Sequence, residues 1–184
     1  MRIIGGKYRS RLIAMPKGAC IRPTQDKVRQ AVFNILGDVS GKAVLDLFAG
    51  SGAFGIEALS RGAGKAVFVE NNSICAAAIR ANLESLAVPH AIYSIIRGNA
   101  LSIFPRFEKA GEKFDLIFLD PPYYKGIAKK CLINIDSYDI LTEIGTAVIE
   151  HFKKDGFDPA LKTLISWKER RYGDTLITIF RKVR

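Results

Sequence analysis

Two short stretches of this sequence combine residue types that can bind a ligand and carry out chemistry on it. The first, residues 46–55, begins with Asp46 and places glycines in the spacing GxGxxG. The second is Asp120-Pro121-Pro122-Tyr123, which directly follows an apolar run. Both follow predicted strands, and open α/β sheets bind ligands outside the carboxyl ends of their strands. These two stretches are therefore the candidate chemical centre of the protein.

The glycine-rich stretch by itself is typical of a dinucleotide site, because Glu70 follows Gly50 by twenty residues, where an acid binds a ribose diol. Asp46 favours another cofactor. A carboxylate at the end of the first strand repels a pyrophosphate, but it attracts the ammonium or sulfonium region of S-adenosylmethionine. Glycine also lets backbone approach such a ligand closely. We therefore predict an S-adenosylmethionine site, in which Glu70 accepts hydrogen bonds from the ribose hydroxyls and Asn99 contacts the adenine. The predicted cofactor-binding residues are Asp46, Phe48, Ala49, Gly50, Ser51, Gly52, Glu70, Asn71, Asn99 and Ala100.

The second stretch has groups that can hold an amino group of a nucleobase. Two consecutive prolines cannot continue a strand ladder, so the backbone leaves the sheet there. The Asp120 carboxylate and the Pro121 carbonyl can each accept a hydrogen bond from an exocyclic N–H, and Tyr123 offers a ring for stacking. An alkylated amine loses its proton readily, so no general base is needed. Catalysis then depends on aligning the amino group with the methyl donor. We predict amino methylation, with Asp120, Pro121, Pro122 and Tyr123 as catalytic residues.

The elements that must position these residues alternate along the chain. The pattern predicts strands at residues 43–47, 66–70, 91–96, 114–120 and 145–151, helices at 53–60, 73–86 and 127–133, and a closing antiparallel pair at 161–168 and 175–181. Such an order implies an α/β fold with a mainly parallel sheet and helices on both faces. We expect residues 42–184 to form this domain, and residues 1–41 to form a basic extension of a β-hairpin arm and a helix.

The net charge of +10 is concentrated at the two ends of the chain. Residues 1–42 hold nine Lys/Arg against two Asp/Glu, residues 43–152 hold ten against twelve, and residues 153–184 hold nine against four. A near-neutral centre with basic ends indicates contact with a polyanion such as RNA. Arg9 and Arg11 would share one face of an extended arm, and Arg22 and Arg29 would flank the start of the next helix. We expect these four arginines to bind RNA and the arm to supply most of the affinity.

Other classes of protein are excluded by what the sequence lacks. The apolar runs are of strand length, far short of the ~20 residues that a spanning helix needs. The first residues lack the apolar region of a secretion signal, and the three cysteines are widely spaced. Two isolated histidines do not make a metal site. We therefore expect a cytoplasmic protein without a metal or a membrane partner.

Together with these motifs, several further segments resemble the RsmD family. They are Arg2-Ile3-Ile4-Gly5-Gly6, Arg22-Pro23-Thr24, Val28-Arg29, Phe33-Asn34, Asp46-Leu47-Phe48-Ala49-Gly50-Ser51-Gly52-Ala53 and Glu57-Ala58-Leu59-Ser60-Arg61-Gly62-Ala63. The resemblance runs from residue 2 to about residue 151. It implies a Rossmann-like class I methyltransferase, with an antiparallel C-terminal strand, that forms N2-methylguanine in small-subunit (16S) ribosomal RNA. It also implies an assembled or partly assembled small ribosomal subunit as the substrate.

The residues alone leave other functions open. The acceptor motif, Asp120-Pro121-Pro122-Tyr123, does not distinguish adenine N6 from guanine N2. A DNA amino-methyltransferase would share both this motif and the glycine-rich stretch. DNA enzymes of this kind generally carry a separate target-recognition region, for which 184 residues leave little room. A nicotinamide dehydrogenase is disfavoured by Asp46, and an RNA-binding module without catalysis would not explain Asp120-Pro121-Pro122-Tyr123.

Overall fold

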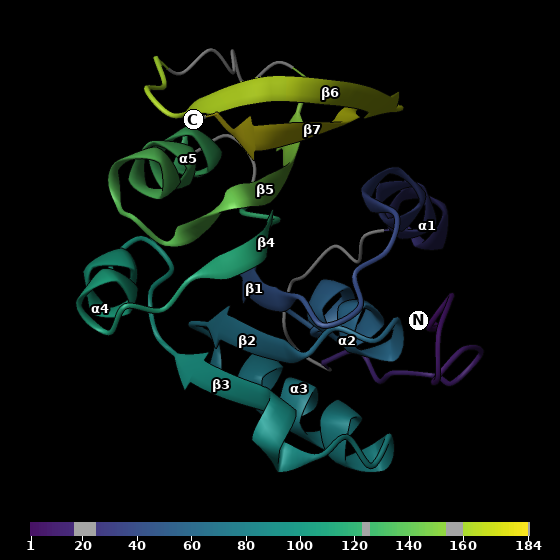
Figure 1. Ribbon diagram of the computed structural model, residues 1–184. Coiled ribbons are helices and arrows are strands. Elements are labelled where there is room, and N and C mark those ends of the chain that lie inside the picture. The colour runs from purple at the N-terminus through teal and green to yellow at the C-terminus, as the bar shows by residue number, and fades with distance from the viewer. Residues whose placement is uncertain (17–24, 123–125, 154–159, 184) are drawn as a thin grey trace. The chain divides into compact units, whose positions relative to one another are not determined.

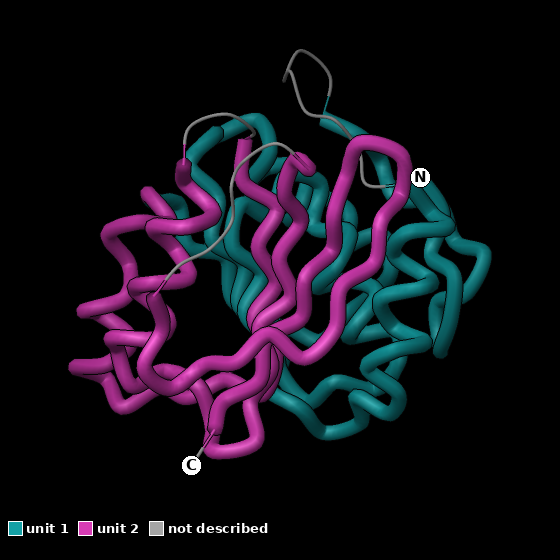
Figure 2. The backbone as a smooth tube through the Cα atoms, turned by 90° about the horizontal axis from the view of Figure 1, so that it is seen from above, with its two compact units in different colours: residues 1–98 teal, residues 99–184 magenta. Residues whose placement is uncertain are grey.

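The computed structural model describes residues 1–16, 25–122, 126–153 and 160–183 (Figure 1). Arg22 and Tyr123, two of the predicted site residues, lie outside the described residues. The chain forms two compact units, residues 1–98 and residues 99–184 (Figure 2). The first unit includes the whole predicted extension, residues 1–41, together with the start of the predicted domain. The division of the chain at residue 42 stays a prediction.

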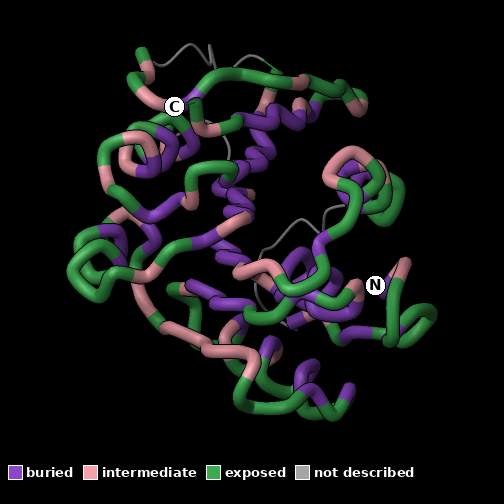
Figure 3. The backbone as a smooth tube through the Cα atoms, in the orientation of Figure 1, coloured by how far each residue is buried: buried purple, intermediate pink, exposed green. Residues whose placement is uncertain are grey.

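The first unit contains a parallel three-stranded sheet in the order β3-β2-β1. Its strands are β1 (Ala43–Leu47), β2 (Lys65–Glu70) and β3 (Tyr93–Arg97), and its helices are α1 (Asp26–Leu36), α2 (Ala53–Ser60) and α3 (Ser73–Ser85), with a 3₁₀ turn at His90–Ile92. The strands β1 and β2 are nearly continuous apolar runs because α2 packs on both of them. All eight residues of α2 are buried, and Figure 3 shows this helix and the two strands as interior elements.

The contact between α2 and β2 requires a glycine. A Cβ on Gly55 would lie 2.3 Å from Cε1 of Phe68, so a larger residue would force the helix away from the strand. At the start of α3, the Asn72 side chain accepts hydrogen bonds from the backbone N–H groups of Ile74 and Cys75. This cap fixes where α3 begins, directly after the carboxyl end of β2.

The second unit contains four strands in the order β4-β5-β7-β6. They are β4 (Phe114–Leu119), β5 (Leu141–Phe152), β6 (Leu164–Tyr172) and β7 (Thr175–Lys182), and the helices are α4 (Phe104–Lys109) and α5 (Ile127–Ser137). The pair β4 and β5 is parallel, whereas β7 is antiparallel to both of its neighbours. The predicted closing antiparallel pair is therefore confirmed, although β6 begins at Leu164. Sequence reasoning missed α4, since it has six residues and Pro105 in its first turn reads as a break.

The N-terminal arm, residues 1–16, is a hairpin with little strand in it. A single antiparallel bridge joins Arg2 to Leu12, and the Ile3 N–H donates to the Arg11 carbonyl at 3.0 Å. Gly6 and Ser10 have φ angles of 74° and 68°, so the chain turns between the two bridged segments. Arg9 lies in that turn. The expectation that Arg9 and Arg11 share one face of an extended strand is therefore wrong, although both side chains are exposed.

Among the helices of the described residues, none has the length and apolar composition that crossing a membrane requires.

Candidate cofactor and acceptor sites

The loop between β1 and α2 has an unusual backbone. Phe48, Gly50 and Gly52 have φ angles of 60°, 56° and 80°, in the region that side chains disfavour. Phe48 is not a glycine, and holding it there costs roughly 1–3 kcal/mol. The Gly52 N–H donates to the Ala49 carbonyl at 2.7 Å, which closes the loop tightly before α2 begins. The loop thus brings backbone groups, rather than side chains, to the carboxyl end of β1.

Asp46, near the end of β1, links that strand to the first turn of α2. Its Oδ2 accepts a hydrogen bond from the Gly55 N–H at 2.9 Å, while Gly52 at the N-cap provides no side chain. The carboxyl group is only 3% exposed. Burial raises the pKa of Asp46 to about 8, the Gly55 hydrogen bond opposes the rise, and the Glu70 carboxylate adds to it. A buried carboxyl of this kind gains most from a nearby cation, so it fits the charged end of S-adenosylmethionine.

Glu70 ends β2 and lies beside the same loop. Its Oε2 accepts from the Gly50 N–H and its Oε1 from the Asn72 N–H, both at 2.8 Å. Each carboxylate oxygen has a second lone pair, so a ribose diol can still donate to this group. Sequence reasoning predicted a ligand-binding role for Glu70. It missed that Glu70 connects residues 48–52, the glycine loop, to the start of α3. Asn71, the next predicted residue, is exposed.

Asn82 in α3 is a polar residue that sequence reasoning missed. It is 2% exposed, and its Nδ2 donates to the carbonyls of Ala14 and Ser51 at 3.0 and 3.1 Å. Its Oδ1 accepts from the Ala14 N–H at 2.7 Å. One buried amide therefore joins the N-terminal arm to the glycine loop. The only signal in the sequence is an asparagine beside the buried Ile79 and Leu83 of the same helix.

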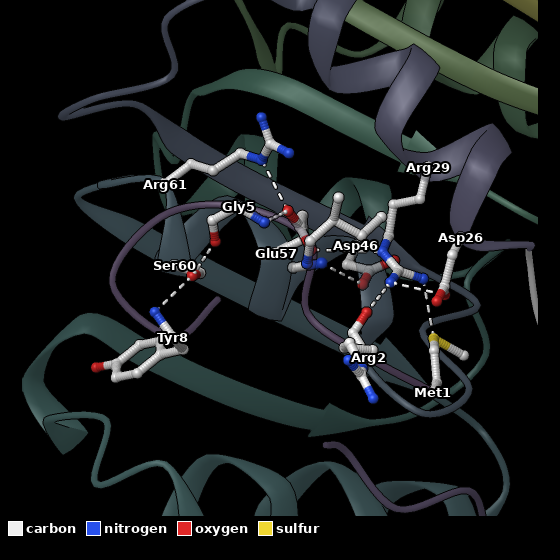
Figure 4. Close-up of polar contacts among 12 residues, drawn as sticks. Met1, Arg2, Gly5, Tyr8, Asp26, Arg29, Asp46, Glu57, Ser60 and Arg61 are labelled. Carbon is white, nitrogen blue, oxygen red and sulfur yellow. Dashed lines mark hydrogen bonds and ion pairs between the residues drawn. The ribbon is translucent and has the colours of Figure 1, made fainter. Parts of the chain in front are cut away.

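A second buried group, Glu57 in α2, holds the beginning of the arm (Figure 4). Its carboxylate is fully buried and accepts from the N–H groups of Ile4 and Gly5 at 2.9 and 2.8 Å. The same carboxylate accepts from Arg61 Nε at 2.8 Å and forms an ion pair with Arg29 Nε at 3.5 Å. Such pairing is what permits a charge to remain in an interior.

The predicted RNA contact of Arg29 is wrong. Its side chain is 1% exposed, and besides the ion pair with Glu57 it bonds to the Arg2 carbonyl, to Asp26 at 3.1 Å and to the Met1 sulfur at 2.9 Å (Figure 4). A guanidinium held on all sides in this way supports the arm and α1, and it has no surface to offer a phosphate.

Gly6 shows why the arm needs glycine at its turn. A Cβ there would lie 1.7 Å from the Ser60 carbonyl oxygen, and the φ of 74° adds a further penalty. The Lys7 N–H donates to that carbonyl at 2.6 Å, and the Tyr8 N–H donates to Ser60 Oγ at 2.9 Å. The arm therefore packs against the end of α2 through these hydrogen bonds. The glycine at position 6 allows the close approach that they require.

The remaining predicted residues lie in the second unit. Asp120 directly follows β4 and is half-buried, Pro121 is buried and Pro122 is exposed. Asn99 is exposed, and its Oδ1 accepts from the Leu101 N–H at 2.9 Å, which uses one of the two lone pairs of that oxygen. Ala100 is 3% exposed. The placement after β4 agrees with the predicted exit of the acceptor motif from the sheet.

The predicted residues thus fall into two groups. In the first unit, Glu70 is hydrogen-bonded to Gly50 of the loop and Asp46 to Gly55 of α2, at the carboxyl ends of β2 and β1. The second unit holds Asn99, Ala100 and the described part of the acceptor motif. Arg9 is exposed on the arm, and Arg11 is exposed with its Nη2 donating to the Ser85 carbonyl at 2.9 Å.

Comparisons with known proteins agree with this architecture. The family described as conserved hypothetical protein 95 matches residues 1–181. The putative rRNA methyltransferase YlbH of Bacillus subtilis is 36% identical over 184 residues, covering 99% of both chains. Ribosomal RNA small subunit methyltransferase D of Escherichia coli K12 is 33% identical over 157 residues, covering 85% of this chain and 77% of that protein.

Solved structures confirm the predicted fold. A putative methyltransferase from Escherichia coli superposes with a TM-score of 0.87 and 26% identity, covering 100% of this chain and 98% of that one. A putative methylase from Haemophilus influenzae gives 0.80 and 28%, with the same coverage. The fold is the α/β methyltransferase fold, with a mostly parallel sheet and antiparallel C-terminal strands. By the match along nearly its whole length and by these relatives, the chain belongs to the RsmD family of ribosomal RNA methyltransferases.

Proposed function

We propose that this protein transfers a methyl group from S-adenosylmethionine to the exocyclic N2 of a guanine in small-subunit (16S) ribosomal RNA. Membership of the family supports the general activity, methylation of ribosomal RNA with S-adenosylmethionine as donor. The substrate that we propose is the RNA within an assembled or partly assembled small ribosomal subunit. The observation that carries the cofactor part of the proposal is the buried Asp46 carboxyl, with its pKa raised to about 8, beside a loop of strained backbone.

The residues of the first unit suit the cofactor. S-adenosylmethionine supplies an electrophilic methyl group on a sulfonium. Asp46 faces the cationic part of the ligand. It ionises when the ligand binds, because the positive charge stabilises a carboxylate that burial has deprived of water. Glu70 receives the ribose hydroxyls without releasing the Gly50 N–H. Asn99 and Ala100, which belong to the second unit, are the residues we assign to the adenine.

The acceptor motif orients the base. Asp120 accepts a hydrogen bond from the exocyclic N–H of the base, and the Pro121 carbonyl accepts a second one. These two bonds direct the nitrogen lone pair toward the methyl group, and the Asp120 carboxylate stabilises the positive charge that forms on the base. Tyr123, outside the described residues, is the proposed stacking partner, with ~1–3 kcal/mol for such a contact. The proton leaves to water after the methyl group has moved, so these residues need no general base among them.

A methylation assay tests the proposal. Radiolabelled S-adenosylmethionine is offered with methyl-free small subunits, naked 16S ribosomal RNA and duplex DNA, and the product nucleoside is identified after digestion. N2-methylguanosine in the ribosomal RNA is the expected product. N6-methyladenosine would contradict guanine specificity, and label in DNA alone would contradict the whole proposal.

Asp120→Ala separates chemistry from binding. The variant should lower the single-turnover rate by a hundredfold or more, at the scale of lost electrostatic support, ~2.7–4 kcal/mol. Its affinity for S-adenosylhomocysteine should stay within about twofold. Glu143→Ala, which removes an exposed carboxylate of the same unit, is the matched control and should keep full activity. Full activity of Asp120→Ala would mean that another group orients the amine.

A further inference from the structure

The hairpin of β6 and β7 carries a concentration of cations that the active-site assignment does not use. Residues 160–183 hold six Lys/Arg against two Asp/Glu. The strand β6 is the last strand of its sheet, and most of its side chains are exposed. The charge therefore lies at an open edge of the second unit.

The strand register sorts these side chains onto two faces. Ile165 pairs with Arg181, Lys168 with Ile179 and Arg170 with Ile177, and residues opposite one another in an antiparallel pair project to the same side. Ile165, Lys168, Arg170 and Arg181 therefore share a face. Glu169 pairs with Thr178 on the other face, where it accepts a hydrogen bond from Thr178 Oγ1 at 3.1 Å.

Trp167 joins the basic face because the ladder is irregular beside it. The register shifts between Ser166 and Lys168, and bulges of this kind redirect a side chain. The guanidinium carbon of Arg181 lies 3.3 Å from the Trp167 ring centroid, and Lys168 Nζ lies 5.4 Å away. The tryptophan remains 39% exposed, next to Ile165 at 51%. A partly exposed ring with two cations beside it combines what is needed to stack a base and to contact the adjoining phosphates.

This face is aligned with the acceptor motif of the same unit. Leu119 pairs with Ile149, Ile149 with Thr178, and Thr178 with Glu169, so one row crosses all four strands. Asp120 follows Leu119 and Arg170 follows Glu169, so these two residues lie at the two ends of the next row across the strands. Three strand spacings of 4.7–4.9 Å put them about 14 Å apart. An RNA strand with its target base at Asp120 can therefore reach β6.

We propose that the β6–β7 surface, consisting of Ile165, Trp167, Lys168, Arg170 and Arg181, binds unpaired RNA that flanks the methylated base. Trp167 stacks on a base of the flanking segment, while the three cations contact its phosphates. The proposal rests on the proposed function, because the ligand is a stretch of the RNA substrate. Exposed apolar residues on an edge strand also suit a second copy of the chain, and charge complementarity favours RNA.

Neighbouring arginines provide a matched test. Arg170 belongs to the β6–β7 surface, whereas Arg171 pairs with Leu176 on the opposite face, and each substitution by alanine removes one charge. Binding of an unpaired 16S ribosomal RNA fragment is measured by fluorescence anisotropy at several salt concentrations. Arg170→Ala should reduce the slope of log affinity against log salt by ~0.7, the value for one contact to a single strand. Arg171→Ala should leave the slope unchanged.

The tryptophan gives the second measurement. Trp167→Ala should weaken binding by roughly 5- to 150-fold, the equivalent of ~1–3 kcal/mol of stacking, and Trp167→Phe should restore most of it. S-adenosylhomocysteine titration establishes that each variant folds. Equal losses in Arg170→Ala and Arg171→Ala, or unchanged binding in Trp167→Ala, would overturn the proposal. A wild-type dimer in sedimentation that Trp167→Ala dissociates would also overturn it, since the surface would then join two copies.

The wild-type protein separates this proposal from the proposed function. If the wild type methylates ribosomal RNA and Trp167→Ala binds the fragment equally well, only the β6–β7 surface is rejected. If the wild type neither binds nor methylates ribosomal RNA, the proposed function itself fails, and the surface loses its ligand with it.

Discussion

In the N-terminal arm the backbone is held by buried side chains of other elements, whereas in the β6–β7 hairpin it is held mainly by strand ladders, because β7 pairs with both β6 and β5. Glu57 and Asn82 bind the arm through main-chain groups, and both are at most 2% exposed. In the hairpin, the exposed Arg181 and the half-buried Lys168 lie beside an exposed tryptophan. Two basic ends of similar composition therefore differ in what their charges do. Arg29 supports the fold, whereas Arg170 is exposed, with its Nη1 donating to the neighbouring Glu169 carbonyl at 2.8 Å.

The largest expected difference between the two regions is in stability. Glu57→Ala leaves the buried Arg29 guanidinium with one carboxylate fewer and removes the acceptor of two arm N–H groups. Breaking a buried pair in this way costs ~3–5 kcal/mol. Urea unfolding should show that loss, whereas Arg170→Ala in the hairpin should change the free energy of unfolding by no more than about 0.5 kcal/mol. Glu84→Ala, at an exposed position of α3, is the control, and an equal loss there would contradict a buried network.

Asp46 gives the next largest effect, on cofactor binding. Its pKa of about 8 means that the ligand-free protein keeps this proton at neutral pH, and that a cationic ligand must displace it. The affinity for S-adenosylhomocysteine should therefore rise by up to tenfold per pH unit from pH 6 to about 8, where it levels off. Asp46→Asn should abolish that dependence, and calorimetric titration of both proteins removes the ligand's own titration. Parallel curves for the two proteins would contradict the assignment of Asp46.

The same pKa predicts how stability depends on pH. Because the folded pKa is raised from 3.8 to about 8, the native state binds more protons than the unfolded state between these values. The free energy of unfolding should therefore fall as pH rises through this window. Asp46→Asn should lose that decline and should be more stable than the wild type at pH 8, because it removes the cost of ionising a buried carboxyl.

The positions of the glycine loop and the acceptor motif could be predicted because each consists of a few consecutive residues that follow a strand. Phe48 to Gly52 follow β1, and Asp120 follows β4, as the residue order indicates. Glu57, Asn82 and Arg29 were not predictable, since their partners lie 53, 68 and 27 residues away. A charged residue read from sequence is expected at the surface. Only the packing of the arm on α2 reverses that expectation for Arg29 and Glu57.

Asn82 tests whether the arm and the glycine loop are coupled. Asn82→Ala deprives Ala14 and Ser51 of three hydrogen bonds in all, and an unsatisfied buried group costs ~1–3 kcal/mol. We expect a loss of stability in that range and a several-fold weaker affinity for S-adenosylhomocysteine, because Ser51 is one of the proposed cofactor-binding residues. Arg80→Ala, at an exposed position of the same helix, should leave both quantities unchanged. An Asn82→Ala protein with lower stability but unchanged cofactor affinity would show that the amide serves the arm alone.

The smallest expected effect is on the salt dependence of RNA binding by the arm. Arg9 and Arg11 are both exposed, and each pair has one arginine that donates to a backbone carbonyl, Arg11 to Ser85 and Arg170 to Glu169. The pairs differ in alignment, because Arg9 lies in a turn, whereas Lys168 and Arg170 share one face of the hairpin. Replacing both by alanine should reduce the slope of log affinity against log salt by about one unit or less. The Lys168→Ala and Arg170→Ala pair in the β6–β7 surface should reduce it by more, up to about 1.4 units for two contacts to a single strand. S-adenosylhomocysteine affinity should be equal in both double variants, because neither pair includes a proposed cofactor-binding residue. A larger slope change from the arm pair would reverse the ranking and would make the arm the principal RNA surface, as its share of the charge alone predicts.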